Sequence, residues 1–185
     1  MWHRIIRNID ARRLVFVDEF GVTIRLARLF GWAPRGRRSR GLIPRNYGTN
    51  LSVCAALSLE GITAVMSIDG AIDSLAFEQY VDKILAPTLK PRQLVIMDNL
   101  SVHKQAVVRK AIETTGARVV FMPSYSPDFN PAEMAISVIK AALRRVQATT
   151  REALEAALPA SLDGVSPHVA LNMFRHCGYS VQYMC

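Results

Sequence analysis

The sequence predicts an α/β fold in which helices flank one mixed β-sheet. Short apolar runs separated by turn residues fill the first 70 residues, a pattern typical of antiparallel strands. A strand, a helix and another strand then follow in order, and this order requires a parallel crossover. Beyond residue 131 apolar residues recur at helical spacing. A chain of 185 residues, half of them hydrophobic, is expected to form a single domain, residues 1–185.

Two hairpins are predicted in the antiparallel part. The apolar run RRLVFVDEF is followed by the partly alternating segment GVTIRLARLF, which indicates a hairpin around Gly21. The runs NLSVCAALSL and ITAVMSI flank Glu60 and Gly61, which form a second hairpin signal. A helix is then expected to begin with Ser74 as its N-cap and to end at the Pro87 break.

The later elements alternate between strands and helices. QLVIMD, residues 93–98, is a continuous apolar run closed by an acid, which is typical of a strand buried on both faces. A helix from about Lys104 to Thr115 follows, with Gly116 after its end, and ARVVFMP is the next short strand. Three further helices are predicted, at residues 131–146, at 150–158 and from about 166 onward.

Composition indicates a cytoplasmic protein. No run approaches the roughly 18 apolar residues that a membrane span needs, and the N-terminus lacks the apolar segment of a secretory signal. The chain has three cysteines, an odd number without metal-ligand spacing, which argues against a disulfide framework. These cysteines are Cys54, Cys177 and Cys185.

The net charge of +8 is concentrated in the first 50 residues. They hold eleven arginines and no lysine against three acids, whereas the remaining residues balance to zero. The densest part, about residues 32–46, is called here the arginine loop, and its arginines are Arg35, Arg37, Arg38, Arg40 and Arg45. Because guanidinium groups match phosphate oxygens, the loop is predicted to lie on a nucleic-acid backbone. The alternative is a solvated loop that aids solubility.

The stretch PSYSPDFNPAEMAISVIK holds one carboxylate at a stiff helix start. Asn130 is expected to cap this helix, with Pro131 at its first position and Glu133 reaching back to close a capping box. The alternative is that Glu133 is a metal ligand, which requires partner carboxylates. Asp18 and Asp98 each close an apolar strand run, and sites in α/β sheets gather at the carboxyl ends of strands. These three acids could therefore converge.

The helix that carries Glu133 has a cationic face. Ser137, Lys140 and Arg144 follow Glu133 at i+4, i+7 and i+11, an arrangement that suits a polyanionic substrate. An ordinary amphipathic helix is the alternative. The opposite stripe, expected to face the core, comprises Ala135, Val138, Ile139, Ala142 and Val146.

Three blocks of the sequence carry a family resemblance. FVDEFG, MDNLSVHK and PSYSPDFNPAEMAISVIK resemble, in order, the motifs of DDE transposases of the bacterial insertion sequence 630 family, relatives of mariner elements. Asp98 and Glu133 are separated by 34 residues, which is similar to the spacing of that group. NMFRHCGY resembles the family's C-terminal stretch, so nearly the whole chain is covered. The resemblance implies a ribonuclease-H-like, or retroviral-integrase-like, fold.

The resemblance also implies roles for individual residues. Asp18, Asp98 and Glu133 would be the catalytic, metal-binding carboxylates. The arginine loop and Arg144 would bind DNA, and in mariner relatives the segment at WAPRGRR also supports subunit contacts. Ile136 departs from the family, which usually has tryptophan there, so a packing or DNA contact at this position is in question. Residues expected to support the metal ligands or to face DNA are Glu19, Asn99, His103, Asn130 and Lys140, although His103 could equally be a capped surface histidine.

The implied chemistry is phosphoryl transfer with divalent metal. Oxygen ligands without a His/Cys cluster favour Mg²⁺, for which Mn²⁺ can substitute, and three carboxylates can hold two ions. The resemblance implies cleavage at transposon ends and 3′-hydroxyl transfer into target DNA at TA steps, which kink at low cost. Two alternatives remain: a ribonuclease-H-like nuclease that does not join strands, and a catalytically silent DNA-binding remnant.

The expected partners follow from the same resemblance. The first predicted strand begins by residue 12, so the family's N-terminal helix-turn-helix domain is expected to be missing from this chain. The partners would be transposon-end and target DNA, a second copy in a homodimer, and possibly a separate helix-turn-helix protein or region. The location would be the bacterial cytoplasm, with association to the nucleoid on DNA.

Overall fold

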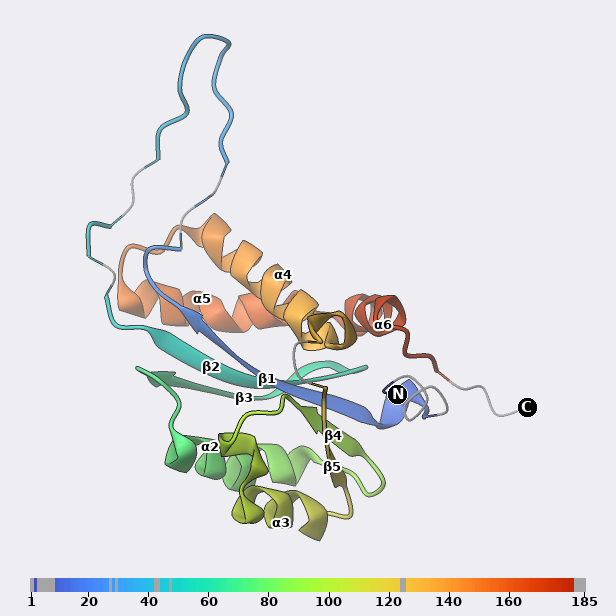
Figure 1. Cartoon of the computed structure of the whole chain (residues 1–185). Coiled ribbons are helices and arrows are strands. Elements are labelled where there is room, and N and C mark those ends of the chain that lie inside the picture. Colours follow the sequence, from blue (N-terminus) through green and yellow to red (C-terminus); the bar gives the residue numbers. More distant parts are fainter. Residues whose placement is uncertain are drawn as a thin grey trace.

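A five-stranded sheet with helices on both faces forms the framework of the protein (Figure 1). The computed structural model describes residues 2, 9–26, 28, 30–41, 44–46, 48–123 and 126–181. The strands are β1 (Leu14–Val22), β2 (Leu51–Ser58), β3 (Gly61–Asp69), β4 (Leu94–Met97) and β5 (Arg118–Phe121). The α-helices are α2 (Ser74–Tyr80), α3 (Ala106–Thr114), α4 (Pro131–Val146), α5 (Arg151–Asp163) and α6 (Pro167–His176). Shorter helical turns are η1 (Ala11–Arg13), η2 (Val81–Leu85), η3 (Ala86–Thr88), η4 (Val102–Lys104) and η5 (Pro127–Phe129).

The sheet is mixed, as predicted. Its order is β3-β2-β1-β4-β5, with β1 antiparallel to β2, β2 antiparallel to β3, and both β4 and β5 joined by parallel pairing. The parallel register aligns Leu14 with Leu94 and Phe16 with Ile96. Continuing this register by two residues brings Asp18 level with Asp98, so the pairing of β1 with β4 places two of the predicted site residues side by side.

The hairpin predicted around Gly21 is wrong. Gly21 lies inside β1 and pairs with Ser52 of β2, and the described residues between 23 and 50 contain no strand. The partner of β1 comes later in the chain because the buried run of β2 covers it better than the arginine-rich segment could. The second hairpin is confirmed, and Gly61 is required there: its φ is +104°, and a Cβ would lie 2.6 Å from the carbonyl oxygen of Val165.

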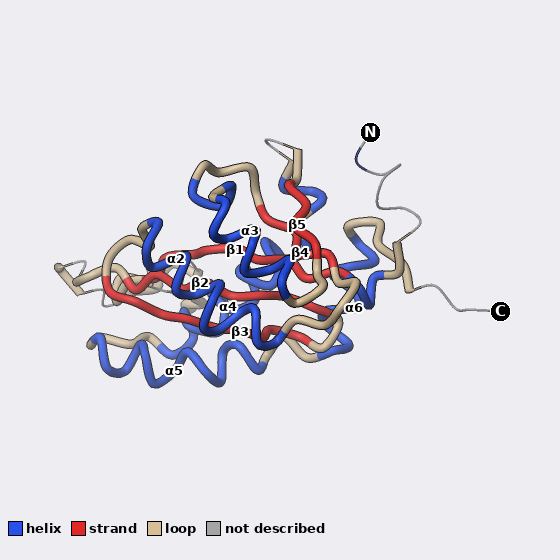
Figure 2. Tube along the Cα trace, turned by 90° about the horizontal axis from the view of Figure 1, so that it is seen from below, coloured by secondary structure: helices blue, strands red, loops and turns tan. Residues whose placement is uncertain are grey.

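Side-chain alternation in the strands builds a hydrophobic core on each face of the sheet. Phe16 and Phe20 of β1 point to the face covered by α4, α5 and α6, where Phe174 packs against Phe16. Val15 and Val17 point to the other face, covered by α2, η2 and α3. Figure 2, seen from below, shows α2 and α3 on this second face. Even-numbered residues of β1, including position 18, therefore face α4.

The helices differ from prediction in three details. The N-cap of α2 is Asp73, whose side chain accepts from Ala76 N–H, and not Ser74. Helix α5 passes through Pro159 and ends at Asp163, since the packed apolar side of the helix outweighs the proline. Helix α4 buries Ala135 and Ile139 as expected, but Val138 and Val146 are exposed. Ile136 and Leu143 are buried in their place, because the helix side that faces the sheet, α5 and α6 runs through Ala132, Ile136, Ile139 and Leu143.

None of the helices in the described part of the chain is long and apolar enough to cross a membrane. Cys54 and Cys177 are buried as free thiols, and Cys185 lies outside the described residues.

Replacing Phe174 with alanine is expected to lower the free energy of unfolding by about 3–5 kcal/mol. The ring is fully buried and meets Phe16 edge to face, with 5.4 Å between the ring centroids. Urea unfolding measures the change. Leu75→Ala is the control, because the Leu75 side chain is mostly exposed and its loss should change stability by about 0.5 kcal/mol or less. A similar small change for both variants would contradict this account of the core.

Candidate active site

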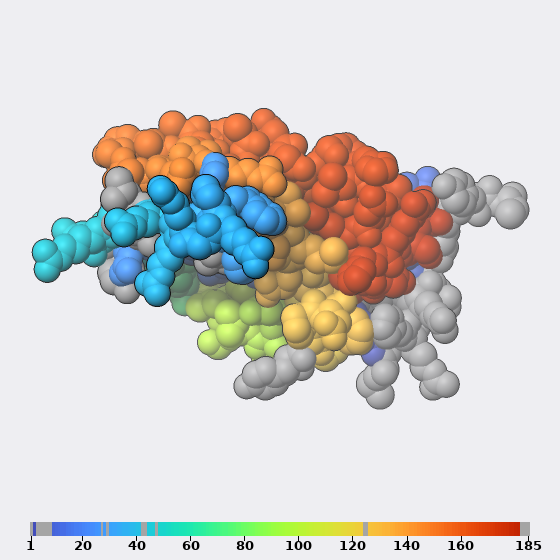
Figure 3. Space-filling model, turned by 90° about the horizontal axis from the view of Figure 1, so that it is seen from above, coloured from blue at the N-terminus to red at the C-terminus, as the bar shows by residue number. Residues whose placement is uncertain are grey.

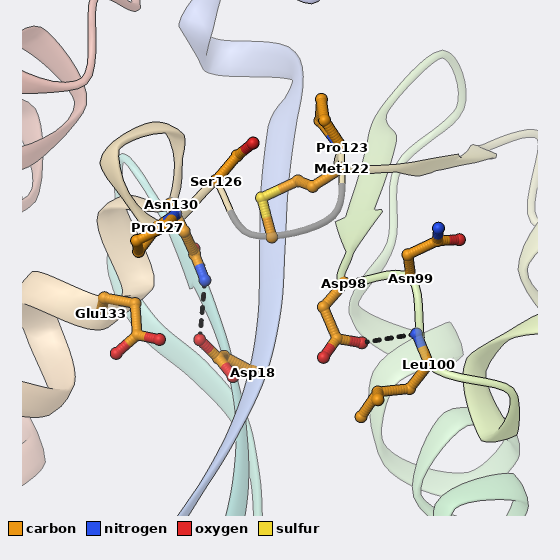
Figure 4. Close-up of a pocket in the computed structure, with 10 residues that line it drawn as sticks. All are labelled: Asp18, Asp98, Asn99, Leu100, Met122, Pro123, Ser126, Pro127, Asn130 and Glu133. Atoms are coloured by element: carbon orange, nitrogen blue, oxygen red, sulfur yellow. Dashed lines mark hydrogen bonds between the residues drawn. The ribbon is translucent and has the colours of Figure 1, made fainter.

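Three acids from separate parts of the fold line one open cavity of about 400 Å³ (Figure 4). Asp18 comes from β1, Asp98 directly follows β4, and Glu133 lies in the first turn of α4. Their side chains turn toward a common space, with Asp18 between the other two. The full lining is Asp18, Asp98, Asn99, Leu100, Met122, Pro123, Ser126, Pro127, Asn130 and Glu133.

The sheet creates this cavity because neighbouring strands end at different heights. The prediction that Asp18 ends its strand is wrong, because pairing with β2 extends β1 to Val22. Strand β4 stops at Met97, so β1 runs on past it and leaves the Asp18 side uncovered. The N–H of Met122 donates to the Met97 carbonyl at 2.9 Å, which ends β5 at the same level. The following segment then leads into Asn130 and α4.

Asn130 joins Asp18 to the helix that carries Glu133. Its side-chain Nδ2 donates to Asp18 Oδ2 at 2.7 Å, while its Oδ1 accepts from the N–H of Ala132 at 3.1 Å (Figure 4). The predicted N-cap is thus confirmed. The predicted capping box is wrong, because the Asn130 N–H donates to the carbonyl of Pro127 at 2.9 Å and is not available to Glu133. The Glu133 side chain is exposed and faces the cavity.

Asp98 is held by the segment that follows β4. Its Oδ1 accepts from the N–H of Leu100 at 3.2 Å and lies 2.5 Å from His103 Nδ1. The second ring nitrogen of His103, Nε2, lies 3.3 Å from Glu19 Oε1. His103 is buried, 3% exposed, and packs on the ring of Phe77. His103 is therefore not a surface histidine but a bridge between Asp98 and β1.

The two aspartates have the same kind of support. The N–H of the next residue, Glu19, donates to Asp18 Oδ1 at 2.8 Å, and a side chain, that of Asn130, holds the other oxygen. Asp98 likewise has a nearby backbone N–H and one side-chain partner. Each carboxylate is thereby oriented by one backbone N–H and one neighbouring side chain.

The surroundings shift the pKa values of Asp18, Asp98 and His103. Burial raises the pKa of Asp18 to about 6; the Glu19 N–H and Asn130 lower it, and the charges of Glu133 and Asp98 raise it further. Burial also raises the pKa of Asp98, but contact with His103 and the Leu100 N–H outweigh this and hold it below its usual value. Burial lowers the pKa of His103, yet contacts with Asp98 and Glu19 bring it to about 9.

The donor set fits a hard divalent cation. Carboxylate oxygens are the preferred ligands of Mg²⁺ and Mn²⁺, and a cation would relieve the repulsion that Asp98 and Glu133 exert on Asp18. Within the described residues, no three His, Cys, Asp or Glu side chains stand close enough to hold one ion together. Shared coordination therefore requires the side chains around Asp18 to move closer.

The other predicted residues lie at increasing distance from the cavity. Asn99 is exposed and lines it. Lys140 is farther along α4, with Nζ 5.9 Å from the ring centroid of Phe20, and Arg144 is in the last turn of that helix. Ile136, at the position where the family usually has tryptophan, is buried in the core and does not line the cavity.

The arginine loop stands apart from the acids. Its five arginines are exposed, and none of them lines the cavity. The loop projects beyond the α4–α6 face of the sheet, in front of α4 and α5 when seen from above (Figures 1 and 3). At its base, Arg28 Nη2 donates to the carbonyl of Arg145 at 3.4 Å, which connects the segment to the end of α4. The aromatic rings of Phe30 and Trp32 are almost wholly exposed beside the arginines.

Sequence reasoning missed the residue that anchors the turn before Asn130. The Tyr179 hydroxyl donates to the carbonyl of Phe129 at 2.6 Å and accepts from Trp2 Nε1 at 3.1 Å. The only available signal was the tyrosine of NMFRHCGY, which had no assigned role. The cavity-lining role of Met122, Pro123, Ser126 and Pro127 was also missed, because their position depends on where β5 ends.

A mixed sheet of this order, flanked by helices and bearing acids where β1 passes the end of β4, defines a ribonuclease-H-like fold, as predicted. The chain belongs to the DDE superfamily endonuclease family, whose model matches residues 13–155.

Solved structures of the Mos1 mariner transposase share the fold. The crystal structure of its catalytic domain superposes with a TM-score of 0.66 at 16% identity, covering 95% of this chain and 80% of that one. A pre-cleavage Mos1 transpososome superposes with a TM-score of 0.67 at 15% identity, covering 98% of this chain and 60% of that one. The Mos1 paired-end complex with Mg superposes with a TM-score of 0.69 at 17% identity, covering 95% of this chain and 56% of that one. This chain thus spans little more than half of the Mos1 chains in those complexes. The sequence matches no curated protein significantly.

Proposed function

We propose that this chain is the catalytic domain of a DDE transposase, which cleaves DNA at transposon ends and transfers the 3′-hydroxyl into target DNA. The observation that carries the proposal is the convergence of Asp18, Asp98 and Glu133 on one cavity, in a chain of the DDE endonuclease family. The Mos1 structures of paired-end and strand transfer complexes share this fold and agree with the proposal.

The three acids would hold the metal, and their neighbours would keep them in place. Two Mg²⁺ or Mn²⁺ ions, when bound, would activate the attacking oxygen and neutralise the leaving oxygen of an in-line phosphoryl transfer. Asn130 orients Asp18 relative to α4, and His103 orients Asp98 relative to β1. Lys140 and Arg144, on the same face of α4 as Glu133, would contact DNA phosphates, as would the arginine loop.

Finer features are proposed on the resemblance of the three motif blocks. The chain would be a member of the bacterial insertion sequence 630 family and would act at TA steps. It would work as a homodimer on DNA, with transposon ends recognised by a helix-turn-helix region outside residues 1–185, which form one catalytic domain. Its location would be the bacterial cytoplasm, on the nucleoid when bound to DNA.

Nicking of supercoiled plasmid tests the proposed activity. The chain is expected to nick DNA in Mg²⁺ and in Mn²⁺ but not in EDTA, and Glu133→Gln, of nearly the same shape, is expected to abolish nicking. Circular dichroism and DNA binding verify that the variant remains folded. Equal nicking by wild type and variant would overturn the assignment of Glu133. A pre-cut duplex with a free 3′-hydroxyl then tests joining, because a nuclease without strand transfer would leave it unjoined.

Binding of the chain to plain duplex DNA is expected to weaken steeply with salt. Because each neutralised phosphate contributes a slope of roughly 0.9 in log K against log salt, Arg35→Gln/Arg37→Gln/Arg38→Gln should reduce the slope by up to about 2.7. Fluorescence anisotropy between low and moderate salt measures both constants. A slope that the substitutions leave unchanged would show that the arginine loop is only a solvated segment.

A further inference from the structure

The net charge of zero beyond residue 50 conceals an uneven distribution. Five of the twelve cations in that part of the chain lie between residues 92 and 118, together with two of its twelve acids. The cations are Arg92, Lys104, Arg109, Lys110 and Arg118, and the acids are Glu113 and the site residue Asp98. The five cations, Glu113 and Arg13 of η1 make up what is called here the α3 belt.

Contacts along the belt show that it is continuous. Lys104, Arg109 and Lys110 line one shallow hollow, and Arg109 and Arg118 line a second one that shares Glu113 with the first. The N–H of Arg92 donates to the carbonyl of Gly116, which also lines the second hollow. Arg13 Nε in turn donates to the carbonyl of Arg92 at 2.9 Å.

The belt cations are exposed and only weakly neutralised. Arg109 forms an ion pair with Glu113, the acid of the belt. Its Nη1 lies 3.9 Å from Glu113 Oε1, and both side chains are about half exposed. The guanidinium of Arg109 also lies over the Phe121 ring, 5.9 Å from its centroid, which holds it near the sheet edge. Ion pairs as exposed as this one contribute little, so the belt remains a surface of predominantly positive charge.

The belt extends from the segment after the cavity-lining residues to the N-terminal ends of the parallel strands, because Arg118 pairs with Leu94 at the start of β4 and Arg13 directly precedes β1. Lys104 ends η4, which follows the cavity-lining residue Leu100 after one residue. Helix α3 and α4 lie on opposite faces of the sheet (Figure 1), and from below α3 lies by the β5 edge (Figure 2). Cationic surfaces therefore lie on both sides of the sheet: α4 with the arginine loop on one, and on the other the α3 belt, whose Lys104 comes four residues after the cavity-lining Leu100.

Strand transfer requires two DNA segments at one cavity at the same time. We propose that the α3 belt binds the target duplex through its phosphates, while α4 and the arginine loop hold the transposon end. This inference rests on the proposed function, since a nuclease that does not join strands needs only one duplex. Arginine and lysine side chains contact DNA phosphates without regard to base sequence. Such contacts suit a target duplex, which the protein would bind at many different sequences.

A pair of matched double variants tests the belt. Lys110→Gln/Arg118→Gln removes two exposed belt charges, and Lys83→Gln/Arg175→Gln removes two exposed charges outside it, one of them already paired with Asp82. In anisotropy with plain duplex DNA the belt variant should lose up to about 1.8 from the salt slope, at roughly 0.9 for each phosphate contact. The outside variant should bind like wild type. Equal slopes for the two variants would overturn the belt as a DNA surface.

A strand transfer assay then identifies the duplex. With a fixed pre-cut end, the target concentration for half-maximal joining should rise roughly tenfold or more in the belt variant. The maximal joining rate and the half-saturating concentration of the pre-cut end should stay unchanged. A rise in the requirement for the pre-cut end alone would overturn the assignment. Absence of metal-dependent joining in wild type contradicts the proposed function, whereas normal joining by the belt variant contradicts the belt alone.

Discussion

Replacing Asp18 with asparagine is expected to lower the rate of metal-dependent cleavage by roughly 10³-fold or more, equivalent to about 4 kcal/mol of barrier. Asp18 is the central acid of the three, and burial together with the charges of Glu133 and Asp98 disfavours its ionised form. An amide cannot replace the charge that holds a divalent cation. Plasmid nicking at saturating Mg²⁺ measures the rate.

A metal-binding readout separates this effect from a general loss of activity. Because a ligand that binds only the native state stabilises it, Mn²⁺ should raise the thermal unfolding midpoint of wild type but not of Asp18→Asn. Asp128→Asn is the control, since Asp128 is an exposed acid of the neighbouring turn η5 that does not line the same cavity. A Mn²⁺-induced rise of equal size in wild type and Asp18→Asn would remove Asp18 from the metal site.

Replacing Asn130 with alanine is expected to have two effects at once. The loss of the N-cap of α4 should lower the free energy of unfolding by about 1–2 kcal/mol. The loss of the hydrogen bond to Asp18 should weaken metal affinity by roughly 10–100-fold, as is typical when a partner of a metal ligand is removed. Urea unfolding without metal gives the first quantity, and titration of the unfolding midpoint with Mg²⁺ gives the second.

Thr150→Ala is the matched control for this variant. Thr150 caps α5, where its hydroxyl accepts from the N–H of Ala153 at 3.2 Å, and it does not line the cavity. Its loss should lower stability by a comparable amount and leave metal affinity unchanged. Asn130→Asp should keep the cap yet place a second carboxylate against Asp18. If Asn130→Ala and Thr150→Ala respond equally to Mg²⁺, Asn130 is only a helix cap.

Local signals were sufficient for most elements of the fold. The N-cap of α4 and the starts of α5 and α6 were predicted, because a helix start depends on a few consecutive residues. Gly116, with φ of +82°, ends the α3 segment as expected, and the Glu60-Gly61 turn joins β2 to β3. Strands β4 and β5 were visible as short apolar runs since both faces of the sheet are covered. Asp98 was visible for the same reason, since it directly follows the run of β4.

The contacts between these elements depended on the tertiary structure. The strand that covers β1 is β2, 29 residues beyond its end, and no property of the residues around Gly21 indicates that choice. The buried side of α4 depends on how α5, α6 and the sheet together surround it. Such long-range packing selects among local patterns that are almost equal in energy, so the sequence pattern alone leaves it open.

The organisation of the site shows the same division. Residue type and spacing were enough to indicate Asp18, Asp98 and Glu133, because two of these acids close apolar runs and the third stands at a predicted helix start. The bridge from Asp98 through His103 to Glu19 joins residues 84 positions apart, and the α3 belt gathers cations from η1, β5 and the segments around α3. Side-chain contacts at this separation exist only after strands β1, β4 and β5 pair in register, because that pairing sets which side chains come within hydrogen-bonding distance.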